Sequence, residues 1–455
     1  MNRDTLVSNR SASFWIVVFA AQFLSIIFIS LELWIPLLFA GALLLIIFSP
    51  YDLIPLISLL ILSLFIGYYI VEEPIGIRIV DILISISVIS YILYKAFRGD
   101  LSLIKSPLDK QIFIFIIGIS FSLIGAQLFV NGIINLLRHL ELFAIFYIIM
   151  DIVFSRGKAA IKNLLDYYVY IATCASILAI TMLYFSNDSR AFGVTGSPLS
   201  DLIVSALIIT ISQIYIRQSL SQRLKYSFLS FILFVQIIMT QTRGAWLSLL
   251  LAVLFLILLL QLASISSIIK HTVWVSLLLF LAIMTSSTIF TNAFIGIVHR
   301  VEHLQQLNVG TLHYRIILWE AGINTFLSHY INGIGIGHFP LLSGDFSSIG
   351  NSTFFIENIK GLTTHNIIIS YLSETGLIGI LCLLLFFRSV FLLGNKIYVI
   401  SDCLADYQLS IPLFCILFFV CISSFYAGAW FWSINGVQFM FFLSLSAIIA
   451  KHSEP

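Results

Sequence analysis

The sequence predicts an all-α membrane protein whose helices cross the bilayer many times. Of its 455 residues, 60% are hydrophobic and only 10% are charged, whereas soluble domains carry about 25% charged residues. Apolar runs recur along the whole chain, and a helix that crosses about 30 Å of hydrocarbon needs about 20 apolar residues. These observations exclude a soluble, disordered or disulfide-stapled protein. With a net charge of +2 the chain has no basic face that could bind nucleic acid. The sequence contains no C-x-x-C motif, so cysteines do not indicate a metal site.

On this criterion we expect about twelve to fourteen membrane spans. The higher count places them at 14–31, 34–48, 51–70, 78–97, 111–130, 133–153, 165–185, 199–216, 226–241, 244–260, 272–291, 366–387, 411–427 and 429–450. Several runs are short, above all the two on either side of Thr242 and Arg243, so both counts stay open.

Positive charge predicts the orientation of the chain. Most of the 23 Lys and Arg residues fall in segments on the side of the N-terminus, which the positive-inside rule makes cytoplasmic, together with the C-terminus. A polar segment at 291–364 then lies outside as a large periplasmic loop, between a first bundle (1–290) and the last helices (365–455). Six of the nine histidines lie between 299 and 365. In the loop, HYRIILWEAGINTFLSHY predicts an amphipathic helix along the membrane surface.

Two arginines on the expected outer face are candidates for anion binding. Arg243 lies between two apolar runs in IIMTQTRGAWLSLL, where an arginine is costly unless it is paired or reaches lipid phosphates. Arg315 begins the amphipathic helix, with Trp319 and Glu320 one turn further on. Stacking on Trp319 with Glu320 as ion-pair partner is the alternative for Arg315.

His365 and the polar residues that follow it form the second candidate group. His365 opens a span, and the N–H groups of a helix N-terminus disfavour a protonated imidazole, which suits a general base. Asn366 follows directly, and Glu374 is an ionisable group inside the span. The alternatives are an ordinary interfacial histidine and a glutamate that bonds to a neighbouring helix.

Weaker candidates have more than one interpretation. Arg190 lies in a turn-rich outer loop, and Gly333, Gly335 and Gly337 alternate in a turn that could offer backbone amides to a phosphate. Arg138, His139 and Glu141 form either an internal ion pair or part of a polar cavity. Tyr426, Trp430 and Trp432 could stack on sugars or belong to an aromatic belt at the membrane interface. His299, Glu302 and His303 match a zinc-protease pattern, but a third zinc ligand is not indicated.

Four motifs in order resemble the bacterial O-antigen ligase family, which includes O-antigen and exopolysaccharide polymerases. They are T-Q-T-R-G at 240–244, Y-R-I-I-L-W-E-A at 314–321, N-G-I-G-I-G at 332–337, and T-H-N-x-x-x-x-x-L-x-E-x-G-x-x-G at 364–379. The resemblance runs from about 180 to 395. The first five spans match only in being hydrophobic, and the family usually has twelve spans.

The resemblance implies a GT-C-like membrane glycosyltransferase of the bacterial inner membrane, working at the periplasmic face without a metal or cofactor. It implies that Arg243 and Arg315 bind the diphosphate of an undecaprenyl-diphosphate-linked glycan and that His365 is the catalytic base. Supporting residues are expected among Arg190, Glu374, Asn366 and Trp319.

The acceptor decides between two enzymes with this chemistry. A lipid A-core acceptor makes a ligase, which the residue order favours, and a lipid-linked glycan acceptor makes a polymerase. A transporter or flippase of lipid-linked glycan is the alternative of another class. It predicts charged residues along a cavity through both leaflets, whereas here they collect at the outer face.

Overall fold

The computed structural model describes residues 53–66, 69–71, 77–100, 102, 104–124, 126–185, 200–216, 219–240, 242–262, 311–401, 404–427 and 434–453. The predicted spans 14–31, 34–48 and 272–291 lie outside the described residues.

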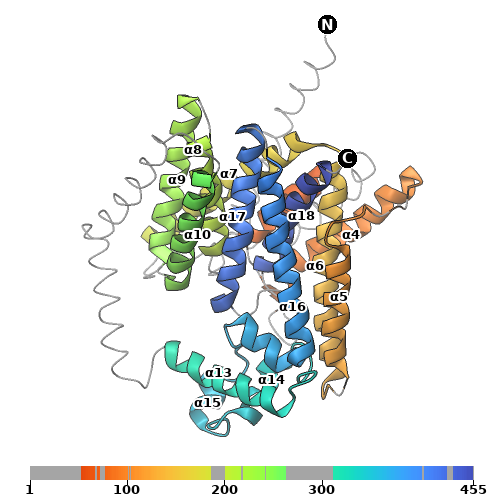
Figure 1. Cartoon of the computed structure of the whole chain (residues 1–455). Coiled ribbons are helices and arrows are strands. Elements are labelled where there is room, and N and C mark those ends of the chain that lie inside the picture. Colours follow the sequence, from red (N-terminus) through yellow and green to blue (C-terminus); the bar gives the residue numbers. More distant parts are fainter. Residues whose placement is uncertain are drawn as a thin grey trace.

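Helices make up nearly all of the described chain (Figure 1). They are α3 (Ile54–Ile66), α4 (Ile79–Arg98), α5 (Asp109–Ser120), the 3-10 helix η1 (Phe121–Leu123), α6 (Phe129–Phe154), α7 (Lys158–Phe185), α8 (Ser200–Ile216), α9 (Leu220–Thr240), α10 (Arg243–Leu262), α13 (Thr311–Ser328), α14 (Phe339–Phe346), α15 (Thr353–Asn358), α16 (Ile367–Val399), α17 (Leu404–Ala427) and α18 (Ile434–His452). Within the described ranges the strands are β1 (Tyr69–Val71) and β2 (Ile77–Arg78), which pair antiparallel. This short hairpin is an addition to the predicted all-α fold.

Seven of the described helices are long and apolar enough to cross a membrane. They are Phe129–Phe154, Lys158–Leu183, Leu220–Thr240, Gly244–Leu262, Ile367–Val399, Asp406–Tyr426 and Ile434–His452. Ile54–Phe65 and Ser200–Ile216 are shorter apolar helices. The prediction of a helical, multi-pass membrane protein is therefore confirmed.

The predicted span 111–130 is wrong. The chain leaves the helix at Ser120, continues as η1 to Leu123, and begins α6 at Phe129. Hydrogen bonds to a distant segment replace those of a continuous helix here, because Ser122 Oγ accepts from the Ile336 N–H and the Leu128 N–H donates to His338 Nε2. Hydropathy finds the apolar run but not this tertiary contact. The span predicted at 366–387 is instead longer and reaches Val399.

Close contacts between helices fix α16 in the bundle. A Cβ added to Gly118 on α5 would lie 2.4 Å from Cys382 Sγ, and one on Gly394 would lie 2.2 Å from the Phe414 ring on α17. Small residues let membrane helices approach closely and gain packing contacts. Phe115 also stacks on Phe386 at a centroid distance of 5.4 Å. The helix that carries His365 at its start is thus held by its neighbours on two sides.

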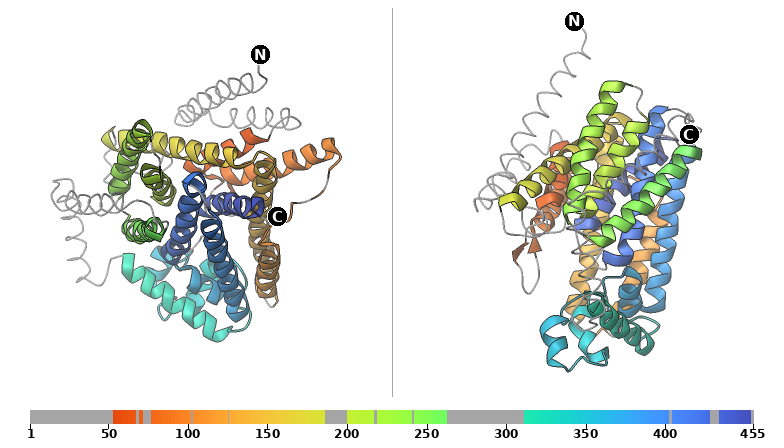
Figure 2. Two further views of the ribbon diagram at one scale, coloured as in Figure 1. Left: turned by 45° about the horizontal axis from the view of Figure 1, so that its top comes forward. Right: turned by 90° about the vertical axis from the view of Figure 1, so that its left-hand side faces the viewer.

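Helices α13, α14 and α15 form a unit beyond one end of the bundle (Figures 1 and 2). Its small core contains Ile317, Leu318, Ala321, Phe339, Phe355 and Ile359. The N-terminal ends of α6 and α16 face this unit, since Leu128 and Thr364 bond to residues in it.

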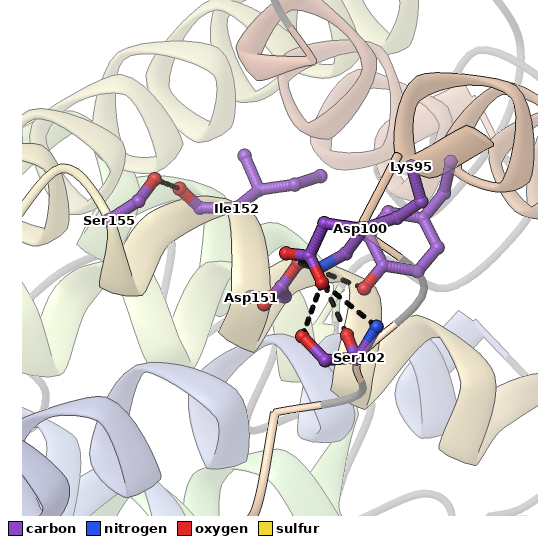
Figure 3. Close-up of polar contacts among 7 residues, drawn as sticks. Lys95, Asp100, Ser102, Asp151, Ile152 and Ser155 are labelled. Carbon is purple, nitrogen blue, oxygen red and sulfur yellow. Dashed lines mark hydrogen bonds and ion pairs between the residues drawn. The ribbon is translucent and has the colours of Figure 1, made fainter. Parts of the chain in front are cut away.

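A polar network joins α4 to α6 at the opposite end of the bundle (Figure 3). Lys95 Nζ lies 2.9 Å from Asp151 Oδ2 and also contacts Asp100, which in turn accepts from the Ser102 hydroxyl. Tyr91 donates to the same Asp151 oxygen. These ion pairs join the end of α4 to the end of α6, at the end of the bundle that is far from α13.

Candidate functional site

One face of α13 packs against the start of α16. Arg315, Trp319 and Gly322 share this face because their spacing is that of successive helical turns. The Trp319 indole N–H donates to the Thr364 carbonyl at 2.9 Å. A Cβ on Gly322 would lie 2.5 Å from Ile369 Cγ2, so a glycine is needed for the approach. This packing places Arg315, on the same face of α13, close to the residues that precede α16.

Hydrogen bonds on both sides of His365 fix its backbone. Asn366 is the N-cap of α16, and its side-chain oxygen accepts from the N–H groups of Ile368 and Ile369. The Thr364 hydroxyl lies 2.6 Å from Ser370 Oγ and also bonds to the Asn366 carbonyl. His365 between them has a φ of 51°, the one positive φ of a described residue other than glycine. Such a left-handed residue costs about 1–3 kcal/mol and persists only where its surroundings hold it.

The surroundings of His365 favour a neutral imidazole. Burial lowers the pKa of His365, and the positive charge of Arg315 lowers it further. Within the described part of the chain, neither the imidazole nor the Arg315 guanidinium has a hydrogen bond or ion pair. A histidine and an arginine thus lie within electrostatic range of each other, and no described residue is bonded to their polar side-chain atoms.

The predicted alternative for Arg315 is wrong. Glu320 does not pair with it; the Glu320 carboxylate accepts from the Ser348 hydroxyl at 3.2 Å. The Trp319 indole is also directed to Thr364, away from a stacking role. Trp319 and Asn366, predicted as supporting residues, both hold the backbone around His365.

Arg243 begins α10 at the same end of the bundle, although its side chain lies outside the described residues. The next residue, Gly244, packs against the ring of Tyr426, since an added Cβ would lie 2.6 Å from Tyr426 Cδ2. Arg315 is close enough to Tyr426 to interact electrostatically with it. Tyr426 therefore connects the start of α10 with Arg315.

Tyr426 is in turn held by Asp201 at the start of α8. The Tyr426 hydroxyl donates to Asp201 Oδ1 at 2.9 Å, and Asn435 Nδ2 donates to Asp201 Oδ2 at the same distance. Gln438 Nε2 donates to the Asp201 carbonyl. From sequence, Tyr426 is predicted only as a sugar-stacking or aromatic-belt residue, and Asp201 is not predicted at all. The available signal was the presence of an Asp, an Asn and a Gln at the edges of apolar spans, where unpaired polar groups are costly.

Glu374 differs from His365 and Arg315 because its side-chain oxygens have hydrogen-bond partners within the protein. It is buried, and its two carboxylate oxygens accept from the backbone N–H groups of Gly337 and Phe339. The predicted alternative was a bond to a neighbouring helix; the observed partners are the first residue of α14, Phe339, and Gly337 in the turn before it. The idea that the alternating glycines offer amides to a phosphate is wrong, because each N–H from Gly333 to Phe339 already donates within the protein.

Residues 330–335 lie against a break in α16 and bond to its backbone there. Gly376 has a φ of 61° and a ψ of −159°, so the helical hydrogen bonds stop there. The N–H groups of Leu377 and Ile378 donate instead to the carbonyls of Tyr330 and Ile331, and the carbonyls of Ser373 and Glu374 accept from Ile334 and Gly335. In a membrane helix a break is tolerated where such partners replace the lost bonds.

The remaining predicted residues are placed elsewhere or lie outside the described residues. The His139 ring is buried and bonds to Tyr371 and the Asn135 carbonyl, which links α6 to α16. Glu141 interacts electrostatically with Arg138 and Asp81. Six residues lie outside the described part: Arg190, His299, Glu302, His303, Trp430 and Trp432.

Residues 228–384 match a family model described as O-antigen ligase. The matched part includes Arg243, Arg315, His365 and Glu374, and it ends before α17. No curated protein matches the chain.

Proposed function

We propose that this chain, whose residues 228–384 match a family model described as O-antigen ligase, is a membrane glycosyltransferase. It transfers a glycan from undecaprenyl diphosphate to a sugar hydroxyl, with lipid A-core as the acceptor. The reaction takes place at the periplasmic face of the bacterial inner membrane, where the α13–α15 unit lies, and both termini are cytoplasmic. The observation that carries the proposal is the proximity of Arg315 to a half-buried His365 whose pKa is lowered.

In the proposed reaction His365 acts as general base. Its neutral imidazole accepts the proton of the acceptor hydroxyl while the acceptor oxygen attacks the anomeric carbon of the donor sugar. The bond from that carbon to the diphosphate oxygen breaks, and the electron pair leaves with undecaprenyl diphosphate. A positioned general base contributes about 10²–10⁴-fold to a rate.

Arg315 and Arg243 stabilise the leaving diphosphate. Negative charge grows on the bridging oxygen as the bond breaks, and a guanidinium group binds phosphate oxygens bidentately. Interactions that strengthen as charge develops lower the barrier. Arg315 also helps to keep His365 neutral until the donor binds, and the diphosphate charge then offsets that of Arg315, so that the base becomes stronger in the complex.

The ends of the bundle differ in charge as this orientation requires. Cations of the described chain gather at the end away from α13: in or beside the α4–α5 and α6–α7 connections, in the first turns of α9, near the end of α16 and at the end of α18. The positive-inside rule assigns that end to the cytoplasm.

Purified protein and undecaprenyl-diphosphate glycan test the proposal directly. We expect a new glycoside when lipid A-core is added, and none in the Arg315→Ala and His365→Ala variants. Lys360→Ala and His329→Ala are matched controls, because both side chains are exposed on the α13–α15 unit, and they should react like the wild type.

Three results would contradict parts of the proposal. A longer lipid-linked chain without lipid A-core would make the protein a polymerase, and no bond change with movement of the donor across the bilayer would make it a transporter. Loss of activity in EDTA, restored by a divalent cation, would contradict the metal-independent reaction.

A further inference from the structure

We propose that Tyr426, held by Asp201, is a positioning residue that sets the start of α10, and with it Arg243, for binding of the donor diphosphate. The inference rests on the proposed function and extends it to residues outside the segment 228–384.

The contact between Tyr426 and α10 is made at the residue beside Arg243. The three Tyr426 ring atoms nearest to a Cβ on Gly244 would lie at 2.6, 2.7 and 3.0 Å, which is too short for any side chain. The ring therefore lies directly against the Gly244 backbone. A glycine after Arg243 is explained by this ring, and the ring limits where the first turn of α10 can lie.

The position of the ring depends on a buried carboxylate. Asp201 is 6% exposed, and each of its carboxylate oxygens accepts one hydrogen bond, from Tyr426 and from Asn435. Gln438 bonds to the Asp201 carbonyl and to the Ser205 hydroxyl. One acidic side chain thus joins the ends of α8, α17 and α18. The Tyr426 ring, whose hydroxyl is bonded to this carboxylate, in turn contacts α10.

Tyr426 also lies within electrostatic range of Arg315. A residue that contacts the backbone beside one arginine and lies near the other is placed to fix the separation of two guanidinium groups. A diphosphate is a small, rigid ligand, and small displacements of its binding groups weaken binding. The Tyr426 hydroxyl is used by Asp201, so its role is to position the arginines and not to react.

Binding of farnesyl diphosphate to the full chain in nanodiscs, measured by calorimetry, tests this role. Tyr426→Phe keeps the ring and removes the hydroxyl that donates to Asp201. We expect it to weaken binding about five- to tenfold, the value of about one hydrogen bond. In an Arg243→Ala background the same substitution should change nothing further, because the group that it positions is gone.

Two further variants separate positioning from folding. Tyr398→Phe is the matched control, because the Tyr398 hydroxyl donates to the Leu259 carbonyl near the other end of α10 at 3.0 Å; it should bind like the wild type. Gly244→Ala displaces the ring while its hydroxyl remains, and it should weaken binding as Tyr426→Phe does; thermal unfolding measures the stability lost to the added methyl group.

The outcomes separate this inference from the proposed function. Wild-type affinity in Tyr426→Phe, or an equal loss in the Arg243→Ala background, would overturn the positioning role alone. No binding by the wild type, or full binding by Arg243→Ala and Arg315→Ala, would overturn the proposed function and this inference with it.

Discussion

Two polar residues nine positions apart, His365 just before α16 and Glu374 within it, have opposite surroundings. At His365 the backbone is held in a left-handed conformation, and within the described chain the imidazole and the nearby Arg315 have no hydrogen bond or ion pair. At Glu374 the backbone is also interrupted, yet both carboxylate oxygens and the surrounding amides are paired.

This difference separates a site that can bind a ligand from one that stabilises the fold. A buried polar group left unpaired costs about 1–3 kcal/mol, so such groups persist where function requires them. Glu374 satisfies the amides of a loop that crosses a break in α16. Although both residues are polar groups at or within one apolar helix, only His365 has a geometry that leaves an acceptor atom available.

The comparison predicts a large loss of activity without loss of stability at His365. His365→Ala should lower kcat by about 10²–10⁴-fold because the base is removed. Its thermal unfolding should match the wild type, since the imidazole has no hydrogen bond to any residue that the structure describes. Glycosyl transfer with purified components and unfolding followed by tryptophan fluorescence measure the two quantities, and a variant with wild-type kcat would remove the base assignment.

Glu374 should show the reverse order of effects. Glu374→Ala leaves the N–H groups of Gly337 and Phe339 without acceptors, and we expect it to lower the free energy of unfolding by about 1–3 kcal/mol. Glu374→Gln keeps one acceptor oxygen and should lose less. If Glu374→Ala unfolded like the wild type but lost kcat as completely as His365→Ala, the division between the two residues would be wrong.

Local patterns in the sequence were enough to predict much of the fold. Apolar runs of sufficient length predicted α6, α7, α9, α10 and α16, and the helical spacing of the apolar residues in HYRIILWEAGINTFLSHY predicted α13. The order of the motifs predicted a resemblance to the O-antigen ligase family, and residues 228–384 match the model of that family. The catalytic and diphosphate-binding roles of Arg243, Arg315 and His365 stay predictions.

The long-range polar bonds could not be predicted in the same way. The run 111–130 is apolar throughout, yet it is interrupted because Ser122 and Leu128 bond to residues more than 200 positions away. The pairing of Asp201 with Tyr426 likewise joins two helices that no local pattern connects. Hydropathy and periodicity describe one helix at a time, whereas these contacts depend on which helices become neighbours.

The effect of Arg315 on His365 predicts a shift in the pH dependence. Burial and the Arg315 charge both lower the pKa of His365, so in the wild type kcat/KM should rise with pH through a midpoint below the ordinary histidine value of about 6.5. Arg315→Gln removes one of the two causes, and the midpoint of its residual activity should move to higher pH. Arg315→Lys keeps the charge and should keep the wild-type midpoint. An unchanged midpoint in Arg315→Gln would mean that the two side chains do not interact.

The smallest effect concerns the cap that holds His365. Asn366→Ala removes the acceptor for Ile368 and Ile369 and should cost about 1 kcal/mol of stability. Ser352 caps α15 by accepting from Phe355, so Ser352→Ala should cost a similar amount far from His365. Only Asn366→Ala should also lower kcat several-fold, because the left-handed backbone of His365 depends on its flanking bonds. Equal kcat values in the two variants, with equal losses of stability, would mean that the cap stabilises α16 without orienting the base.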